Sequence, residues 1–514
     1  MSPTSIPPRT TTSDDVALLE SLGYKQELGR RMGAFSNFAI SFSIICILAG
    51  GITAFPSAIG AGGGLSVGIG WPLGAAFALV VASAMAQIAS SYPTAGGLYH
   101  WSSILGGKGW GWATAWFNLL GLIFVTASVN FGVWDPFFKS LLAPLLGIDA
   151  SNAGWLGQTL FIAGITIAQG FLNARAPKIT TWLTDFSGYM ILVLAVLLTG
   201  SLLAFHQGPL QFSRLLEFTN MTGLEGSWWP TSGGVMAFLS GLLLVIYTIT
   251  GYDASAHASE ETHEAAKNVP KGIVRSVIWS ALFGFAMIAV FVATMPDIAS
   301  SVKLGFGFFG ALLGTLPAGL KAILSVGIFL ANFLCGLAAL TATSRMMYAF
   351  ARDGGLPFSK SLKTVEPRTK TPVAATWTST FLVIAATMYG DAFLVLSTGC
   401  VVLLYLSYVM PTAAGLFAEG KTWTVKGPFD LGAFSKPIAV LAVLGGLVLA
   451  FVGVQPPNQK VLWLVVAMIA LLAAAWWVFG VRKSFQGPPA RDASDSITDT
   501  SSVGEVEAGW QSST

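Results

Sequence analysis

Residues 249–272 read ITGYDASAHASEETHEAAKNVPKG and follow a long apolar run. The pair Thr250-Gly251 interrupts that run, because glycine loses more backbone entropy in a helix than other residues do. Acidic residues and a histidine then recur at intervals of four, three and four residues, which places their side chains on one stripe of a continuing helix. These positions are Asp253, His257, Glu260 and Glu264.

The composition of the whole chain is that of a membrane protein. The 514 residues are 54% hydrophobic and 10% charged, whereas soluble domains have about 25% charged residues. Runs of roughly 18 or more residues with almost no charge mark membrane-spanning helices. Twelve such runs lie near residues 34–60, 69–92, 109–133, 155–173, 179–205, 233–263, 272–295, 317–350, 371–390, 391–414, 435–455 and 460–481. We therefore predict an all-α polytopic membrane protein with twelve transmembrane helices.

The distribution of basic residues predicts the orientation. If both termini are cytoplasmic, 22 Lys and Arg residues lie on the inner side and 5 on the outer side. This bias agrees with the positive-inside rule. We expect a multi-pass protein of the plasma membrane, with a vacuolar membrane as the alternative.

Two interrupted spans predict the internal organisation. Gly50-Gly51, followed by Thr53 and Pro56, weakens the first span, and Gly251 weakens the sixth at a corresponding depth. Matched breaks are typical of inverted-repeat secondary transporters. The alternative is that the glycines only allow close helix packing.

This organisation divides the chain into six parts. Two inverted repeats of five helices are followed by two further helices, and a loop on the outer side joins the repeats. Both tails are cytoplasmic, and MSPTSIPPRTTTSDD and the last tail are expected to be disordered because they lack core-forming residues. The parts are 1–33 (tail), 34–205 (first repeat), 206–232 (loop), 233–414 (second repeat), 415–482 (last two helices) and 483–514 (tail).

The breaks and the polar stripe suggest a ligand site. Amides freed at a helix amino end favour an anion, and freed carbonyls hold a cation. Asp253 is the deepest acid and therefore a functional candidate. His257 could relay protons or merely line a vestibule. The acids Glu260, Glu261 and Glu264 are expected to form a solvated helix end that pairs with Lys267 or Lys271.

Several classes of function lack support in the sequence. The three cysteines lie in apolar runs and the four histidines are scattered, so we expect no disulfide and no metal site. A phosphate-binding GxxxxGK[ST] motif is absent. We expect no enzymatic activity, no cofactor and no nucleic-acid partner.

Three motifs resemble those of a known superfamily. GYDASAHASEETHEAAKNVPKGI, ASSYPTAGGLYHWSS (Ala89 to Ser103) and SRMMYAFARDGGLPFS (Ser344 to Ser359) are similar to segments of the amino acid, polyamine and organocation permeases. With LGYKQELGRRMGAFSNFAISFSII near the start, the pattern is closest to the amino acid and choline transporter branch, which includes 4-aminobutyrate permeases. The resemblance implies a leucine-transporter-like fold with discontinuous helices 1 and 6.

The resemblance also implies site residues. The amides of Gly50 and Gly51 would hold a substrate carboxylate, and residues 250–253 would take the amino end. Asn118 and Asn332 would line the cavity or make interhelical hydrogen bonds. The implied substrate-binding residues are Gly50, Gly51, Ile52, Thr53, Asn118, Thr250, Gly251, Tyr252, Asp253 and Asn332.

One departure from the family pattern concerns ion coupling. Some proton-coupled relatives carry a lysine in the fifth span, whereas TTWLTDFSGYM here has Ser187 near that position. Asp185 could act in coupling or cap the helix. The coupling candidates are therefore Asp253, His257, Asp185 and Ser187, with a proton or sodium as the ion.

The leading prediction is an importer that moves an amino acid or a 4-aminobutyrate-like zwitterion by proton-coupled alternating access within the lipid bilayer. The alternatives are a permease for choline or a polyamine, and a membrane nutrient sensor that does not transport.

Overall fold

The structure is a computed structural model and describes residues 11–150, 152–223, 231–388 and 392–489. Within these ranges the chain is helical, and its extended contacts are three isolated bridges. The all-α class predicted from the sequence is confirmed.

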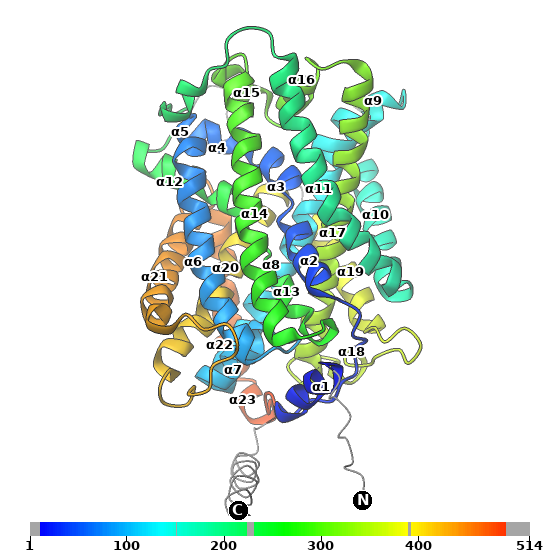
Figure 1. Cartoon of the computed structure of the whole chain (residues 1–514), viewed down its shortest axis with the longest axis vertical. Helices are drawn as coiled ribbons and strands as arrows, with labels where there is room; N and C mark the ends of the chain where they lie inside the picture. Colours follow the sequence, from blue (N-terminus) through cyan, green and yellow to red (C-terminus); the bar gives the residue numbers. More distant parts are fainter. Residues whose placement is uncertain (1–10, 151, 224–230, 389–391, 490–514) are drawn as a thin grey trace, which may run out of the picture.

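Ten helical segments are long and apolar enough to cross a membrane within the described residues, and most run along the long axis of the bundle (Figure 1). Two shorter apolar helices, Gly234–Thr248 and Val373–Thr387, coincide with the predicted sixth and ninth spans. The ten segments are Ala34–Thr53, Leu65–Ser91, Lys108–Leu145, Trp155–Arg175, Pro177–Phe205, Ala265–Thr294, Ala318–Arg352, Phe393–Ala418, Gly432–Gly453 and Gln459–Trp477.

The centre of the bundle and its rim differ in composition. At the centre, α8 (Lys108–Gly132) packs against α17 (Ala318–Arg352) and α20 (Ala392–Ala418). At the rim, α11 (Pro177–Phe205) and α22 (Gln459–Trp477) expose large apolar side chains. Such a rim suits hydrocarbon and not water, because exposed apolar surface is costly in water.

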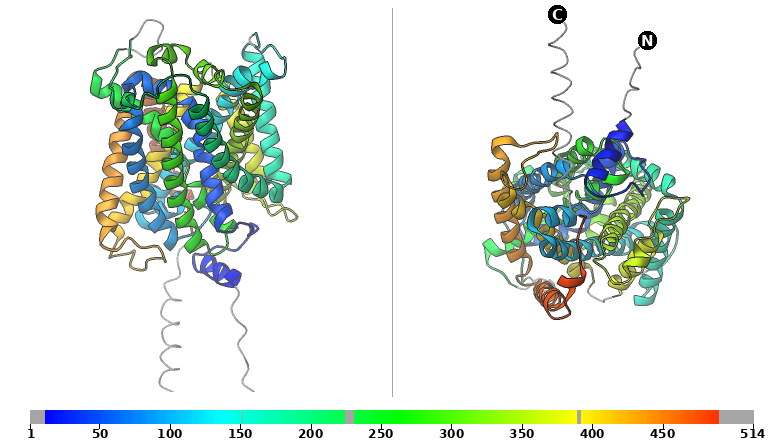
Figure 2. Two further views of the ribbon diagram at one scale, coloured as in Figure 1. Left: turned by 45° about the horizontal axis from the view of Figure 1, so that its top comes forward. Right: turned by 90° about the horizontal axis from the view of Figure 1, so that it is seen from below.

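Short elements mark the two ends of the bundle. At one end lie α1 (Thr11–Ser21), α7 (Leu98–Gly106), α18 (Ser359–Leu362) and α23 (Val481–Ser484), and we call it the α1 end (Figures 1 and 2). At the other end lie α9 (Ala143–Leu145), α15 (Ile298–Leu304) and α16 (Gly307–Leu313).

The first span is divided into three helices. α2 (Ala34–Ile45) ends at Cys46, whose backbone angles (φ 18°, ψ 84°) are not helical, and α3 (Ile47–Thr53) follows. Ala54 then separates α3 from α4 (Phe55–Gly62). The expectation that the paired glycines break the helix is wrong in position, because Gly50 and Gly51 lie inside α3.

The sixth span is interrupted at Gly251. α12 (Gly234–Thr248) ends before it, and a four-residue helix, α13 (Ala254–His257), follows. Gly251 has a φ of 106°, and a Cβ atom there would lie 2.3 Å from Cγ2 of Ile44. Both the backbone angle and the close approach require glycine.

The polar stripe predicted from the four-residue spacing is not continuous. The short 3-10 helix η3 (Ser259–Glu261) follows α13, and Glu264 adopts a left-handed conformation before α14 (Ala265–Thr294) begins. The one-stripe prediction therefore holds for Asp253 and His257 only.

Both tails differ in part from the predicted disorder. Residues 11–15, within the stretch predicted to be disordered, begin α1. Later in the predicted tail 1–33, for which no disorder was predicted, Leu19, Leu28 and Met32 are buried in the core. At the other terminus Phe485 is 2% exposed. Residues 1–10 and 490–514 lie outside the described part of the chain.

Candidate functional site

The two interruptions lie against each other in the middle of the bundle. Ser41 Oγ on α2 donates to the Tyr252 carbonyl at 2.8 Å, and the Ser255 amide donates to Ser41 Oγ at 2.9 Å. The side chain of Ile44 fills the space beside Gly251. Backbone groups that leave the helical pattern at one break are thus satisfied by the other helix, as buried polar groups require.

Asp253 forms the centre of a buried polar cluster. Its Oδ1 accepts a hydrogen bond from the Tyr408 hydroxyl at 2.7 Å, and its Oδ2 accepts one from Asn118 Nδ2 at 3.1 Å. His257 Nε2 lies 3.3 Å from Oδ2. All four side chains are buried. A carboxylate removed from water requires such partners, because an isolated buried charge is very costly.

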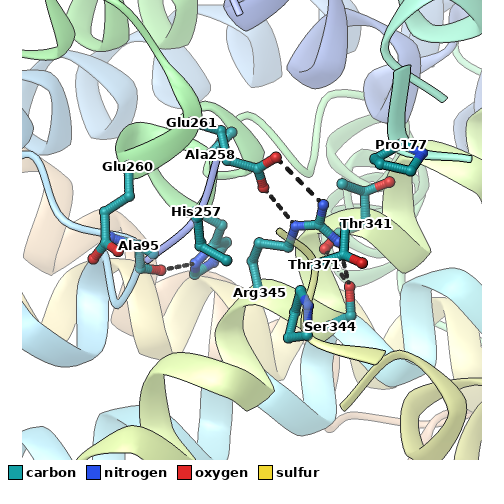
Figure 3. Close-up of polar contacts among 12 residues, drawn as sticks. Ala95, Pro177, His257, Ala258, Glu260, Glu261, Thr341, Ser344, Arg345 and Thr371 are labelled. Atoms are coloured by element: carbon teal, nitrogen blue, oxygen red, sulfur yellow. Dashed lines mark hydrogen bonds and ion pairs between the residues drawn. The ribbon is translucent and has the colours of Figure 1, made fainter. Parts of the chain in front are cut away.

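His257 contacts two acceptors. Its Nδ1 lies 3.2 Å from the Ala95 carbonyl, which can only accept a hydrogen bond (Figure 3). Nδ1 therefore carries a hydrogen, and the contact between Nε2 and Asp253 contains one further proton, on the ring or on the carboxyl group. The geometry therefore assigns one shared proton to the pair of His257 and Asp253.

Aromatic rings and an amide surround this pair. The ring centroids of Tyr252 and Tyr408 are 5.0 Å apart, and those of Tyr405 and Tyr408 are 5.2 Å apart. Asn118 Oδ1 is buried and has no hydrogen-bond partner among the described residues. An unpartnered carbonyl oxygen beside a carboxylate and π-faces is a suitable environment for an ammonium group.

The glycines predicted to hold a carboxylate face neighbouring helices. A Cβ atom on Gly50 would lie 2.8 Å from Cα of Thr248, and one on Gly51 would lie 3.2 Å from Cε of Met287. The Gly50 amide donates to the Cys46 carbonyl at 3.0 Å. In this conformation the alternative explanation, that glycine allows close packing of helices, accounts for the presence of glycine at position 50.

The remaining predicted binding residues are buried and make local contacts. Thr53 Oγ1 donates to the Ala49 carbonyl, Thr250 Oγ1 to the Ile246 carbonyl and Asn332 Nδ2 to the Ile328 carbonyl. Each bond stays within one helical turn. Ile52 is a buried apolar residue of α3.

The coupling candidates on α11 lie apart from the Asp253 cluster. Asp185 Oδ2 accepts from Ser36 Oγ on α2 at 3.0 Å. Ser187 is fully buried, and its hydroxyl has no partner among the described residues. The structure therefore brings together Asn118, Asp253 and His257, and it places Asp185 and Ser187 at a separate interface.

The expectation that Glu260 and Glu261 form a solvated helix end is wrong. Glu261 pairs with Arg345 at 2.6 Å, and both side chains are 3% exposed (Figure 3). Glu260 is fully buried and pairs with Arg352 at 3.0 Å. Only Glu264 matches the expectation, because its side chain is 41% exposed and lies 3.9 Å from Lys267.

The amino-terminal segment covers these ion pairs from the α1 end. The Arg31 and Met32 amides each donate to the Glu261 carbonyl at 2.9 Å, and Gln26 Nε2 donates to the Glu260 carbonyl. On α1, the carboxylate of Asp15 accepts from the first amides of α14. The segment closes the α1 end over the two buried acids.

A cluster of tyrosines and Asp353 extends this closure. The hydroxyls of Tyr24 and Tyr99 donate to Asp353 Oδ2 at 2.7 and 2.8 Å. Burial raises the pKa of Asp353, although the nearby Arg352 and the two hydroxyls oppose the shift. Burial, assisted by Arg352, lowers the pKa of His100 to about 3. His100 is therefore neutral at physiological pH.

Sequence reasoning missed Tyr408, Arg345 and Arg352 as partners of the acids. Tyr408 and Arg345 lie in runs predicted to span the membrane, and Arg352 lies two residues beyond one of them. Charged and polar groups within such runs are expensive and need partners. The sequence did indicate that the acids of residues 253–261 need partners, because they follow an apolar run. Only the fold shows which partner each acid contacts.

An apolar rim around buried charged and polar clusters defines an integral membrane protein with a polar interior. A family model described as amino acid permease matches residues 32–479. The chain belongs to this amino acid permease family, within the amino acid, polyamine and organocation superfamily, and is therefore a transporter and not an enzyme.

Individual relatives align over nearly the full length. Amino-acid permease BAT1 of Arabidopsis thaliana is 33% identical, and the alignment covers 91% of this chain and 95% of that protein. Its homolog in Oryza sativa is 31% identical, with 92% and 95% covered. The GABA-specific permease of Saccharomyces cerevisiae is 28% identical, with 95% and 88% covered.

Proposed function

We propose that the chain is a secondary active importer of an amino acid or a 4-aminobutyrate-like zwitterion, coupled to a proton and working by alternating access. The observation that carries this proposal is the pair of Asp253 and His257, which lies buried beside two helix interruptions. Helix interruptions at mid-membrane are where secondary transporters bind substrate and coupling ions.

The proton argument rests on hydrogen-bond donors and acceptors. Because Nδ1 of His257 faces a carbonyl, its Nε2 and Asp253 share one proton that can be held or released. A substrate ammonium group that contacts Asp253 would compete with the protonated form of the pair. This competition would link substrate binding to proton release.

The substrate class follows from two kinds of support. Asp253, the Asn118 carbonyl oxygen and the ring of Tyr252 offer contacts for an ammonium group. In the proposal, a substrate carboxylate binds at Gly50 and Gly51 only in a second conformation, because here Gly50 packs against Thr248 and its amide donates to the Cys46 carbonyl. The printed names of the relatives include a GABA-specific permease.

The proposed architecture has twelve spans in a five-plus-five inverted repeat. The ten long segments, with Gly234–Thr248 and Val373–Thr387, would supply the twelve. In this arrangement the α1 end faces the cytoplasm, because most Lys and Arg residues lie there. The plasma membrane is the proposed location.

The test is uptake of labelled 4-aminobutyrate into liposomes that contain the purified protein, with an inward proton gradient and with that gradient collapsed. Uptake should require the gradient and should be reduced by unlabelled amino acids. Gradient-independent uptake would contradict proton coupling. No uptake of any amino acid or amine in a protein that binds one would instead indicate a sensor.

Two variants test whether Asp253 and His257 carry the coupling proton. Asp253→Asn and His257→Gln should each remove the proton dependence of uptake, because neither leaves a pair that shares a titratable proton. Asp185→Asn serves as the matched control, since Asp185 lies apart from the cluster. If Asp185→Asn alone abolishes the pH dependence, the coupling site is on α11.

A second candidate is uptake of choline or a polyamine. The specific observation in its favour is the acid surrounded by the rings of Tyr252, Tyr405 and Tyr408, which suits a cation without a carboxylate. Competition by choline or putrescine, with no competition by amino acids, would select this candidate.

A further inference from the structure

A groove opens on the membrane-facing side of the bundle between α2, α11 and α14. Its volume is about 550 Å³, within the range of small-molecule sites. The rings of Phe35, Phe38, Trp279 and Phe283 line it, and Lys271 and Arg275 are its charged residues. None of the described residues that line the groove is acidic.

Four of the five α14 residues that line the groove form a stripe, and the fifth is Gly272. Lys271, Arg275, Trp279 and Phe283 follow one another at intervals of four residues, which keeps them on one helical face. Since α14 begins at the α1 end, the two cations lie nearest that end and the two rings lie deeper in the bundle. The α14 wall of the groove therefore changes from cationic to apolar with distance from the α1 end.

The two cations are unpaired within the part of the chain that the structure describes. Lys271 and Arg275 are exposed, and neither makes a salt bridge or hydrogen bond with any described residue. Asp185 on α11 does not line the groove and is bonded to Ser36. An anion at the mouth of the groove would meet two free positive charges.

The length of the stripe fits one leaflet of a bilayer. With a rise of about 1.5 Å per residue, positions 271 to 283 span roughly 18 Å, and half of the hydrocarbon core is about 15 Å thick. A phosphate level with the cations would thus leave an acyl chain alongside the rings. A free phosphate would leave the apolar part of the groove unfilled.

We propose that this groove binds one anionic phospholipid from the leaflet at the α1 end. Its phosphate lies between Lys271 and Arg275, and one acyl chain packs along Phe35, Phe38, Trp279 and Phe283. The proposal depends on membrane insertion and not on the transported substrate, so either can fail without the other.

Native mass spectrometry of the full-length protein with added lipid tests this proposal. The protein should retain one phosphatidylserine at concentrations where phosphatidylcholine of equal chain length is washed away. The double variant Lys271→Gln/Arg275→Gln should lose roughly tenfold or more in phosphatidylserine retention, because each basic residue contributes to anionic lipid binding. Inorganic phosphate should not displace the lipid.

The matched control is Arg175→Gln/Lys178→Gln. These residues are exposed at the same end of the bundle and lie outside the groove, so retention should stay within about twofold of the wild type. Equal loss in both double variants, or no preference for phosphatidylserine in the wild type, would overturn the proposal in favour of diffuse surface attraction.

A second variant tests the acyl-chain part of the groove without changing the charged residues. Trp279→Ala removes an apolar wall, and Trp279 is 45% exposed, so little packing is lost. It should weaken retention of long-chain phosphatidylserine and leave binding of the dihexanoyl form nearly unchanged. Equal effects on both chain lengths would contradict an acyl-chain groove.

Discussion

At position 251 the backbone geometry and the packing both require glycine. Its φ of 106° disfavours any L side chain, and a Cβ atom would contact Ile44 at 2.3 Å. Gly251→Ala should therefore destabilise the protein by about 1–3 kcal/mol and abolish uptake. Thermal unfolding in detergent measures the first effect.

The control for this substitution is Gly200→Ala. Gly200 lies within α11, and a Cβ atom there would have no neighbour within 4 Å. Alanine is the better helix former by about 1 kcal/mol, so stability should be unchanged or slightly higher. A similar loss in both variants would mean that the conformation of Gly251 is not the cause.

His100 gives a second prediction at this scale, and it concerns pH. The pKa of His100 is about 3 in the folded protein, against about 6.5 for an unfolded chain. Between these values the unfolded state binds the proton and the folded state does not. Stability is therefore lost as pH falls below about 6.5, by about 1.4 kcal/mol per pH unit for this residue.

The measurement is the unfolding temperature at pH 7 and pH 5. His100→Asn keeps a polar partner for Thr94, whose hydroxyl lies 2.7 Å from Nδ1, and should reduce the loss on acidification. The control is His206→Asn, at the residue that directly follows α11. It should leave the loss of stability on acidification unchanged. An unaltered pH dependence in His100→Asn would assign the acid sensitivity to other groups.

At the scale of elements, the pair of Glu261 and Arg345 joins η3 to α17. Removing one partner of a buried ion pair leaves an unpaired charge and costs about 3–5 kcal/mol. Arg345→Met should show this loss, whereas Glu261→Met/Arg345→Met should recover most of it. The free energies of unfolding of the two single variants and the double variant give the coupling.

The exposed pair of Glu264 and Lys267 is the control for that cycle. Its side chains are 41% and 58% exposed, so its coupling should be below about 1 kcal/mol. If the two cycles give equal couplings, the α1 end is open to water in solution.

Asp15 connects α1 to the start of α14. Its carboxylate accepts from the amides of Glu264 and Ala265 at 2.7 and 3.1 Å, as a helix cap does. Asp15→Asn should cost about 0.5–2 kcal/mol, because it also weakens the 3.7 Å ion pair with Arg30. Asp14→Asn, an identical change at the exposed neighbour, should cost little.

At the scale of the whole molecule, the apolar runs were sufficient to predict the all-α fold. Ten long apolar segments occupy the predicted positions because length and low charge decide membrane insertion locally. The interruption near Gly251 was also local, since glycine tolerates a positive φ. The break at Cys46 was not predictable, because no propensity of cysteine indicates it.

The site was predictable from the sequence only where the contacting residues are close in sequence, or where a polar residue in an apolar run indicated that it needs a partner. Asp253 and His257 meet because they are one helical turn apart. The pairs of Glu261 with Arg345 and Glu260 with Arg352 join residues 84 and 92 positions apart. Spacing within one helix carries no information about such partners, so these acids were wrongly expected in solvent.

The closure of the α1 end has a consequence for kinetics. Residues 26, 31 and 32 bond to the backbone of Glu260 and Glu261, whose side chains hold two arginines of α17. Opening this end must release these bonds together, before water replaces them. Any step that opens it is expected to have a large activation enthalpy, so cooling should slow turnover much more than it weakens substrate binding.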